Sequence, residues 1–201
     1  MAPRAYSMER RSAHIAATRE RVLDAAMAAY AARGIRATSM TDVARAADVA
    51  PGTVLNHFPT ADALVTAVLE RITRSLEPPD ARIFRGARSR GVRVRRLVDG
   101  LFAFYDRGNP WFAILRGEFD EVPALRAAEA AVWASVEPLY GQALGSVAAD
   151  DLIRGAVLGL TSPATLGALR EAGLSIEDAA RVVGDALVDL VDAAQRRTTV
   201  G

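Results

Sequence analysis

The segment from Thr38 to Phe58 constrains the fold of this chain more than any other part, because it predicts two short helices joined by a tight turn. The apolar residues of the first helix recur at helical spacing, at Met40, Val43, Ala44 and Ala47. Ser39 stands three residues before Asp42, an arrangement in which a side-chain oxygen accepts from the free amides of a first helical turn. We therefore expect a helix that begins after Ser39 and packs one face inward.

The second helix is expected to begin at Pro51, where the missing N–H costs no hydrogen bond, after a turn over residues 47–50. If Val54 points inward, a rotation of about 100° per residue directs the opposite face to solvent. Gly52 and Asn56 lie on that face, flanked by Thr53 and Leu55. A short helix with this exposed face, supported by a partner helix across a tight turn, is typical of a helix-turn-helix that enters the major groove of DNA.

The same residues carry a resemblance to a known family. The segment resembles the DNA-binding domain of the TetR family of bacterial repressors, whose signature runs roughly ATS-xx-IA-xx-AGVS-xGTLY-xHF-xSKE-xL. The matching residues are Ala37-Thr38-Ser39, Val43-Ala44, Val49, Gly52-Thr53, His57-Phe58-Pro59 and Ala63-Leu64. Asp48 departs from a glycine at a turn position expected to need a positive φ, which Asp tolerates better than most residues. Three other positions also depart from the signature. Ala50 replaces a capping serine, Leu55 replaces a tyrosine that commonly reaches a phosphate, and Ala61 replaces a lysine that does the same.

The predicted DNA contacts are Thr38, Ser39, Pro51, Gly52, Thr53, Leu55, Asn56 and His57. Asn56 is the candidate base reader, because an amide side chain can pair bidentately with adenine N6 and N7. The resemblance implies a phosphate contact for His57. Residues 1–60 hold eight arginines and five acidic residues, a formal charge of +3 that suits a polyanion. Arg4, Arg10 and Arg11 fit either a minor-groove arm or a disordered basic terminus.

The composition excludes several other classes of protein. Cysteine is absent, which removes disulfides, thiol catalysis and thiolate metal sites, and we predict neither a metal nor a cofactor. No uninterrupted apolar run of about 20 residues exists and the N-terminus is polar, which argues against a membrane span and a signal peptide. These observations predict a cytoplasmic protein that does not associate with the membrane.

The hydrophobic periodicity predicts an all-α fold of about nine helices. A flexible arm and a three-helix helix-turn-helix domain are expected over residues 1–60, and a helical ligand-binding and dimerisation domain over residues 61–201. The expected helices beyond the motif cover 15–33, 61–76, 92–107, a short helix from Asn109-Pro110, 123–145 with a bend at Pro138, 150–170 and 175–197. A polar connection is expected over residues 77–91, and its arginines at positions 82–96 fit a solvated segment better than an anion site.

Eight of the twelve aromatic residues fall between Phe102 and Tyr140, more than one packing face requires. Core packing accounts for any one of them, but the resemblance implies an inducer pocket among these middle helices, with apolar walls and a few polar contacts. The predicted ligand contacts are Phe102, Tyr105, Asn109, Trp111, Phe112, Leu115, Phe119, Trp133, Tyr140 and Thr165. The expected ligand is a small hydrophobic or aromatic inducer.

The last two predicted helices are apolar around much of their circumference, which fits either an intrachain core or a partner subunit. The resemblance implies a four-helix interface between two copies of the chain. The predicted dimer contacts are Leu152, Ala156, Gly159, Leu160, Val183, Leu187, Leu190 and Val191.

We therefore expect a homodimeric repressor that binds a pseudo-palindromic operator in double-stranded DNA and is released by its inducer. The alternatives are an all-α enzyme and a small-molecule-binding protein without a DNA function. A nonspecific architectural protein would not need the aromatic domain. The densest acidic residues, Glu118, Asp120 and Glu121, are interpreted as exposed groups at a helix end rather than as a catalytic cluster.

Overall fold

The computed structural model describes the backbone of residues 3–118 and 120–200, with the side chains of residues 10–109, 111, 117–118 and 120–197. Over these residues the regular elements are nine α-helices and three short 3-10 helices, which confirms the predicted all-α class. Two compact units are formed: the first unit comprises Met1–Ser75 and Pro110–Glu129, and the second comprises Leu76–Asn109 and Ala130–Gly201. The packing boundary thus falls beyond the predicted boundary at residue 60.

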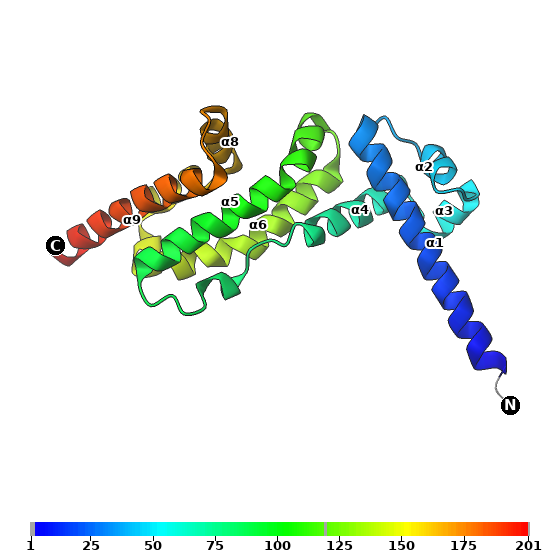
Figure 1. The fold of residues 1–201 in the computed structure, drawn as a ribbon, viewed down its shortest axis with the longest axis horizontal. Helices are drawn as coiled ribbons and strands as arrows, with labels where there is room; N and C mark the ends of the chain where they lie inside the picture. The colour runs from blue at the N-terminus through cyan, green and yellow to red at the C-terminus, as the bar shows by residue number, and fades with distance from the viewer. Residues whose placement is uncertain (1–2, 119, 201) are drawn as a thin grey trace. The chain divides into compact units, whose positions relative to one another are not determined.

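The first unit begins with four helices: α1 (Pro3–Arg33), α2 (Met40–Ala46), α3 (Pro51–His57) and α4 (Ala61–Ser75). Helix α1 contacts all three of the others, and α2 also contacts α3 (Figure 1). The predicted start of α1 at Ile15 is wrong, because the helix already runs from Pro3. Residues 10–17 are exposed on every side, so this part of α1 is helical without a buried face.

Local capping determines where these short helices begin. The Ser39 hydroxyl accepts from the Asp42 amide at 3.1 Å, and the Asp42 carboxylate accepts from the Ser39 amide at 3.1 Å, which is the predicted cap in its reciprocal form. Asp48 has φ 53°, as predicted for the turn between α2 and α3. Gly34 ends α1 with φ 86°, and the Thr60 hydroxyl accepts from the Ala63 amide at the start of α4. The helix-turn-helix is therefore specified by residues within it.

The core of the first unit is small and made chiefly from α1 and α4. Its least exposed apolar side chains are Val22, Leu23, Ala26, Tyr30, Val43, Ala44, Val54, Phe58, Leu64, Val65, Val68, Ile72 and Leu125. Burial raises the pKa of the Tyr30 phenol to about 12, so this ring stays neutral in the core. The apolar stripe of α4 packs against α1, which is why α4 belongs to the first unit rather than to the predicted second domain.

The rest of the chain forms η1 (Ala81–Phe84), α5 (Arg90–Leu115), η2 (Arg116–Glu118), α6 (Pro123–Leu144), η3 (Gly145–Ala149), α7 (Asp151–Leu160), α8 (Pro163–Glu171) and α9 (Ile176–Val200). Helices α5 and α6 each have one end in the first unit and the other in the second. Each unit therefore contains part of the same two continuous helices.

Two further predicted helix boundaries are wrong. The helix expected to restart at Asn109-Pro110 is continuous, because a proline inside a helix removes one backbone hydrogen bond without obliging the chain to turn. The helix expected over residues 150–170 is instead interrupted, because the Ser162 hydroxyl accepts from the Thr165 amide and Pro163 opens a new helix.

The second unit is built around one apolar cluster. Its members are Val94, Leu97, Val98, Leu101, Phe102, Val136, Leu139, Tyr140, Ala143, Leu144, Val147, Ile153, Val157, Leu166, Ala179, Ala180, Val183, Leu187, Val191 and Ala194. Helix α9 contacts α7 and α8, and its stripe of small and branched residues faces this cluster. Among the described residues no single helix is long and apolar enough to span a membrane; α7 and α8 reach that threshold only when taken together, as a pair bent by 47°.

Candidate nucleic-acid interface

Helix α3 presents the exposed face that its sequence predicts. Val54 is fully buried, and this places Gly52 and Asn56 in solvent. Gly52 has no other group within 4 Å of the position that a Cβ would occupy, and the Leu55 side chain is 49% exposed. Pro51 is exposed, while Thr53 and His57 are half-buried at the sides. The predicted orientation is confirmed, and contact of these residues with DNA stays a prediction.

The hydroxyls of Thr38 and Ser39 are both hydrogen-bonded within the chain, and their contact with DNA stays a prediction. The Thr38 hydroxyl donates to the Gly34 carbonyl at 2.8 Å, which fastens the end of α1 to the start of α2. The Ser39 hydroxyl donates to Asp42 at 2.6 Å, and this bond is the main reason that the pKa of the Asp42 carboxyl is lowered. An ionised Asp42 in the first turn of α2 disfavours a phosphate there. The two hydroxyls act as caps that position the helix-turn-helix.

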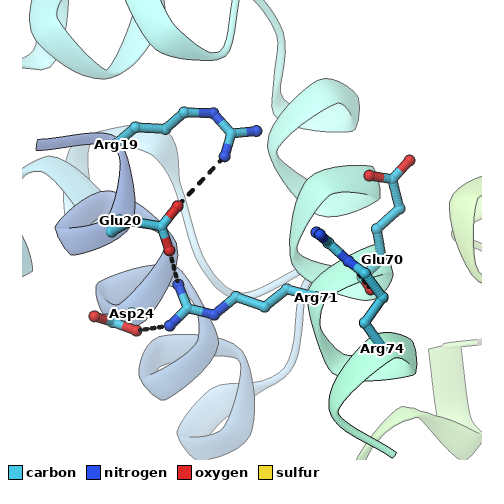
Figure 2. A network of polar contacts seen from close by, with 6 residues as sticks. All are labelled: Arg19, Glu20, Asp24, Glu70, Arg71 and Arg74. Carbon is cyan, nitrogen blue, oxygen red and sulfur yellow. Dashed lines mark hydrogen bonds and ion pairs between the residues drawn. The ribbon is translucent and has the colours of Figure 1, made fainter. Parts of the chain in front are cut away.

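A network of charged side chains joins α4 to α1 behind the helix-turn-helix (Figure 2). The Arg71 guanidinium donates to Glu20 at 2.9 Å and to Asp24 at 2.6 Å, so one fork from α4 holds two carboxylates one turn apart on α1. The Arg19 guanidinium lies 5.0 Å from the centre of the ring of Phe58, the C-cap residue of α3. This network was not predicted, although Glu20 and Asp24 at a spacing of four residues signal a shared partner.

Figure 2 also shows Arg74 on α4, where its guanidinium donates to the Glu70 carbonyl at 3.2 Å and so folds back along the helix. Arg71 and Arg74 line an open hollow of about 320 Å³ together with Arg19, Glu20 and Leu23. Four of its five lining side chains are charged. The hollow therefore does not fit an apolar inducer, and it lies outside the set of predicted ligand contacts.

The connection between α1 and α2 is held by an acidic residue from a distant part of the sequence. The amides of Ile35 and Arg36 donate to the two carboxylate oxygens of Glu118, at 2.8 and 3.0 Å. The Arg36 guanidinium also forms an ion pair with Glu121. The interpretation of Glu118 as an exposed acid is therefore wrong, because this residue is partly buried and binds two backbone amides, whereas Glu121 is exposed as predicted. The amides that bind Glu118 lie more than 80 residues away in the sequence, so they leave no local signal.

The predicted ligand contacts separate into groups. Phe102 is fully buried and Tyr140 is 5% exposed within the core of the second unit, and Tyr105 packs against the same cluster. The Tyr140 and Thr161 hydroxyls are hydrogen-bonded at 3.0 Å, and burial raises the pKa of both Tyr105 and Tyr140. The Trp133 ring lies 5.7 Å from the Tyr140 ring and its residue is 42% exposed. These aromatic residues form a tyrosine-containing cluster with one accessible tryptophan.

The remaining predicted ligand contacts lie elsewhere. Asn109 is exposed, and the Thr165 hydroxyl donates to the Gly159 carbonyl at 2.7 Å as part of the junction between α7 and α8. Trp111 is half-buried in the first unit. The side chains of Phe112 and Leu115, and the whole of Phe119, lie outside the described residues.

The predicted dimer contacts also divide. Leu152 is 85% exposed and Leu160 is 38% exposed on α7, with Gly159 beside them in solvent, while Ala156 and Leu190 are half-buried. The assignment of three α9 residues to an interface is wrong for this structure, because their side chains pack inside the second unit of the same chain. These are Val183, Leu187 and Val191. An apolar stripe on a helix does not distinguish a partner from the chain's own core.

Comparison with known proteins connects this geometry to a family. Residues 22–68, which contain the C-terminal part of α1, the helices α2 and α3 and the first half of α4, match the sequence model described as "Bacterial regulatory proteins, tetR family". A comparison of the sequence with curated proteins finds no significant match.

Solved structures match most of the chain. One from Rhodococcus sp., described as a putative TetR-family transcriptional regulator, is 25% identical over 87% of this chain and 97% of its own, with a TM-score of 0.53. A second, described as the superantigen PfiT, is 20% identical over 85% and 94%, with a TM-score of 0.64. A third, the multidrug binding protein EbrR complexed with imidazole, is 24% identical over 82% and 87%, with a TM-score of 0.50.

The two less identical structures show the fold alone, since unrelated functions share folds. The sequence match covers the helix-turn-helix itself, where Val54 points inward and the opposite face of α3 is exposed. Together with the Rhodococcus structure, it shows what class of protein this is. The chain carries the helix-turn-helix DNA-binding domain of the TetR family, and these likenesses support a TetR-family regulator of transcription rather than an enzyme.

Proposed function

We propose that this regulator is a repressor that binds a pseudo-palindromic operator as a homodimer and is released by a small hydrophobic or aromatic inducer. The observation that carries the proposal is the exposed face of α3, on which Gly52 and Asn56 stand in solvent beside a fully buried Val54. The backbone at Gly52 can approach a base edge closely, and the Asn56 amide can read adenine. Such a regulator acts where the chromosome is, in the cytoplasm.

The homodimer is supported by the need to read two half-sites and by the surface of α7. Two copies of α3 would enter successive major grooves about 34 Å apart. Leu152 and Leu160 are exposed on a helix whose Gly155 and Gly159 carry no side chain that would hold a partner away. Two copies of this face would remove both leucines from water, which stabilises association.

The inducer is supported by the tyrosine-containing cluster of the second unit. The bonded hydroxyls of Tyr140 and Thr161 are polar groups within an apolar core, and the partly exposed Trp133 lies beside Tyr140. A ligand that enters beside Trp133 would meet aromatic walls and these hydroxyls, the usual composition of a small-molecule site. The structural relative EbrR is described as a multidrug binding protein, which agrees with an apolar ligand.

Footprinting on the DNA upstream of the chain's own coding sequence tests the function. A repressor protects one short palindrome, whereas a nonspecific DNA-binding protein protects no discrete site and a ligand-binding protein without a DNA function protects nothing. Asn56→Ala should weaken binding to the protected site by about 1–3 kcal/mol per half-site and leave binding to random-sequence DNA unchanged.

Gln142→Ala removes a comparable exposed amide from α6 and serves as the matched control, with no expected effect on DNA binding. Equal losses of specific and nonspecific binding in Asn56→Ala would show that Asn56 anchors the backbone and does not read bases.

A further inference from the structure

Residues 34–39 connect the longest helix of the first unit to the helix-turn-helix, so their conformation determines where α2 begins. Gly34 leaves the helical region with φ 86°, and the Ile35 side chain is buried. The amides of Ile35 and Arg36 fall outside any helix and need acceptors from another part of the chain.

Glu118 supplies both acceptors. Its Oε2 atom accepts from the Ile35 amide at 2.8 Å, and its Oε1 atom accepts from the Arg36 amide at 3.0 Å. Hydrogen bonds to a carboxylate are about twice as strong as those between neutral groups, and two oxygens binding adjacent amides also fix the direction of approach. Ile35 is buried and Glu118 is partly buried, so water competes less for their hydrogen bond.

Gly34 makes room for this contact. A Cβ atom at position 34 would lie 2.7 Å from Glu118 Oε1, closer than a Cβ atom approaches another group, and 3.2 Å from its Cδ atom, so the carboxylate would have to shift. Glycine is therefore needed here both for its positive φ and for the space that the carboxylate occupies. The turn and the carboxylate fit each other, and neither can shift alone without breaking both hydrogen bonds.

Glu118 is attached to the part of the chain that links the two units. It ends η2, directly after α5 and shortly before α6, and both of these helices continue into the second unit. In that unit α5 contributes Leu97, Leu101 and Phe102 to the core. A change in the packing of α5 or α6 in the second unit therefore acts on the backbone that carries Glu118.

From this arrangement we infer that Glu118 is a positioning residue for DNA recognition. Its carboxylate holds the connection that precedes α2 in the chain. This contact makes the orientation of α2 and α3 depend on the positions of α5 and α6. A displacement of α5 by about 1 Å suffices to weaken both hydrogen bonds, because they lose strength steeply with distance and angle. This inference rests on the proposed DNA-binding function and names the contact through which that function is regulated.

Amide hydrogen exchange resolved by residue tests the contact without DNA. In Glu118→Gln, one acceptor oxygen becomes an NH₂ group that faces an amide donor, so exchange at Ile35 or Arg36 should accelerate roughly tenfold to hundredfold. Glu121→Gln is the matched control, since Glu121 pairs with the Arg36 side chain and not with these amides. Unchanged exchange at both amides in Glu118→Gln would overturn the inference.

Exchange in the presence of DNA separates positioning from a merely structural role. When the wild-type protein is saturated with the footprinted fragment, exchange in residues 110–129 should slow, because DNA that holds α2 and α3 also holds Glu118. In Glu118→Gln this slowing should be lost while the fragment is still bound, and affinity for the fragment should fall about tenfold more than affinity for random-sequence DNA. Equal slowing in both proteins would contradict the inference.

Gly34→Ala provides a second variant that acts on the same contact from the other side. It should accelerate exchange at Ile35 and Arg36 as Glu118→Gln does, and combining the two should add little, because each removes the same pair of hydrogen bonds. Fully additive effects would contradict a shared contact. A wild-type protein with no preference for the fragment over random DNA would overturn the repressor function, whereas exchange without DNA would still decide whether Glu118 holds the turn.

Discussion

The two units of this protein are stabilised in different ways. In the first unit, α2 and α3 are seven residues each, shorter than the 12–15 residues at which isolated helices become even marginally stable. Helix α2 depends on its reciprocal cap and on the Glu118 contact that precedes it, and both helices depend on packing against α1. In the second unit, long helices share one apolar cluster around Phe102 and Leu187. The stability of the helix-turn-helix therefore depends on single polar groups, whereas the stability of the second unit depends on the volume of the side chains that fill its core.

The largest expected effect lies in the core of the second unit. Phe102→Ala removes a fully buried ring and should lower the free energy of unfolding by about 3–5 kcal/mol, measured by chemical denaturation. Leu55→Ala, on the exposed face of α3, is the matched control and should change it by less than about 0.5 kcal/mol. A similar loss in both variants would remove the distinction between the two units.

The next effect concerns the surface of the second unit. Leu152→Glu should raise the dimer dissociation constant about tenfold to hundredfold, because an interface would bury an unpaired charge. Analytical ultracentrifugation gives this constant, and circular dichroism should show unchanged helix content. Leu187→Glu should instead unfold the chain, because Leu187 is fully buried in its own core. A Leu152→Glu protein that remains as dimeric as the wild type would place the interface elsewhere.

A smaller effect compares the same backbone conformation in both units. Asp48 has φ 53° in the first unit and Glu77 has φ 48° in the second. Asp48→Val should destabilise the protein by about 1–2 kcal/mol and weaken DNA binding, while Asp48→Gly should be neutral or slightly stabilising. Glu77→Val should destabilise the chain similarly, but it should not alter DNA binding under conditions in which the variant remains folded. If Asp48→Val melts at the temperature of Asp48→Gly, the turn is not left-handed in solution.

The smallest effect is a pH dependence. The pKa of Asp42 is lowered in the folded protein, chiefly by the Ser39 hydroxyl, so ionised Asp42 adds stability above its unfolded pKa of about 3.9. That contribution is lost as the pH falls through the lowered folded value. Asp42→Asn should therefore weaken the first unit near neutral pH and match the wild type at strongly acidic pH.

Asp178 provides the matched test in the second unit. Its pKa is also lowered, first by Arg181 and then by Ser175, at the start of α9. Asp178→Asn should show the same pH dependence of stability but leave DNA binding intact. A DNA-binding defect in Asp178→Asn as large as that in Asp42→Asn would show that capping matters equally in both units.

The sequence predicted the first unit better than the second, because the information there is local. Ser39, Asp48 and Pro51 act within a few residues of themselves, so caps, turn and helix start follow from spacing alone. The split between α7 and α8 was equally local, at Ser162-Pro163, but the apolar periodicity across it concealed the cap. Continuation of α5 through Pro110 followed from no local rule, since proline is compatible with either outcome.

Contacts between distant residues were not predictable in this way. Glu118 is 83 residues from Ile35, and its two acceptor bonds leave no periodic pattern in the sequence. The stripe on α9 was correctly seen as buried, but the periodicity did not reveal whether the chain itself or a second copy covers it. The structure answers that for Leu187, which lies in its own core, and leaves Leu152 exposed on the surface.

The ion pairs that Arg71 forms between α4 and α1 will also affect how salt titrations of DNA binding are interpreted. The slope of log affinity against log salt is normally taken to count the phosphates that a protein neutralises. The ion pairs of Arg71 with Glu20 and Asp24 are partly exposed, so the same ions that compete for phosphates also screen the bond between α4 and α1. The measured slope will then be steeper than the phosphate contacts alone would make it. In Arg71→Met this bond is already absent, so the slope should be smaller and should reflect the phosphate contacts alone.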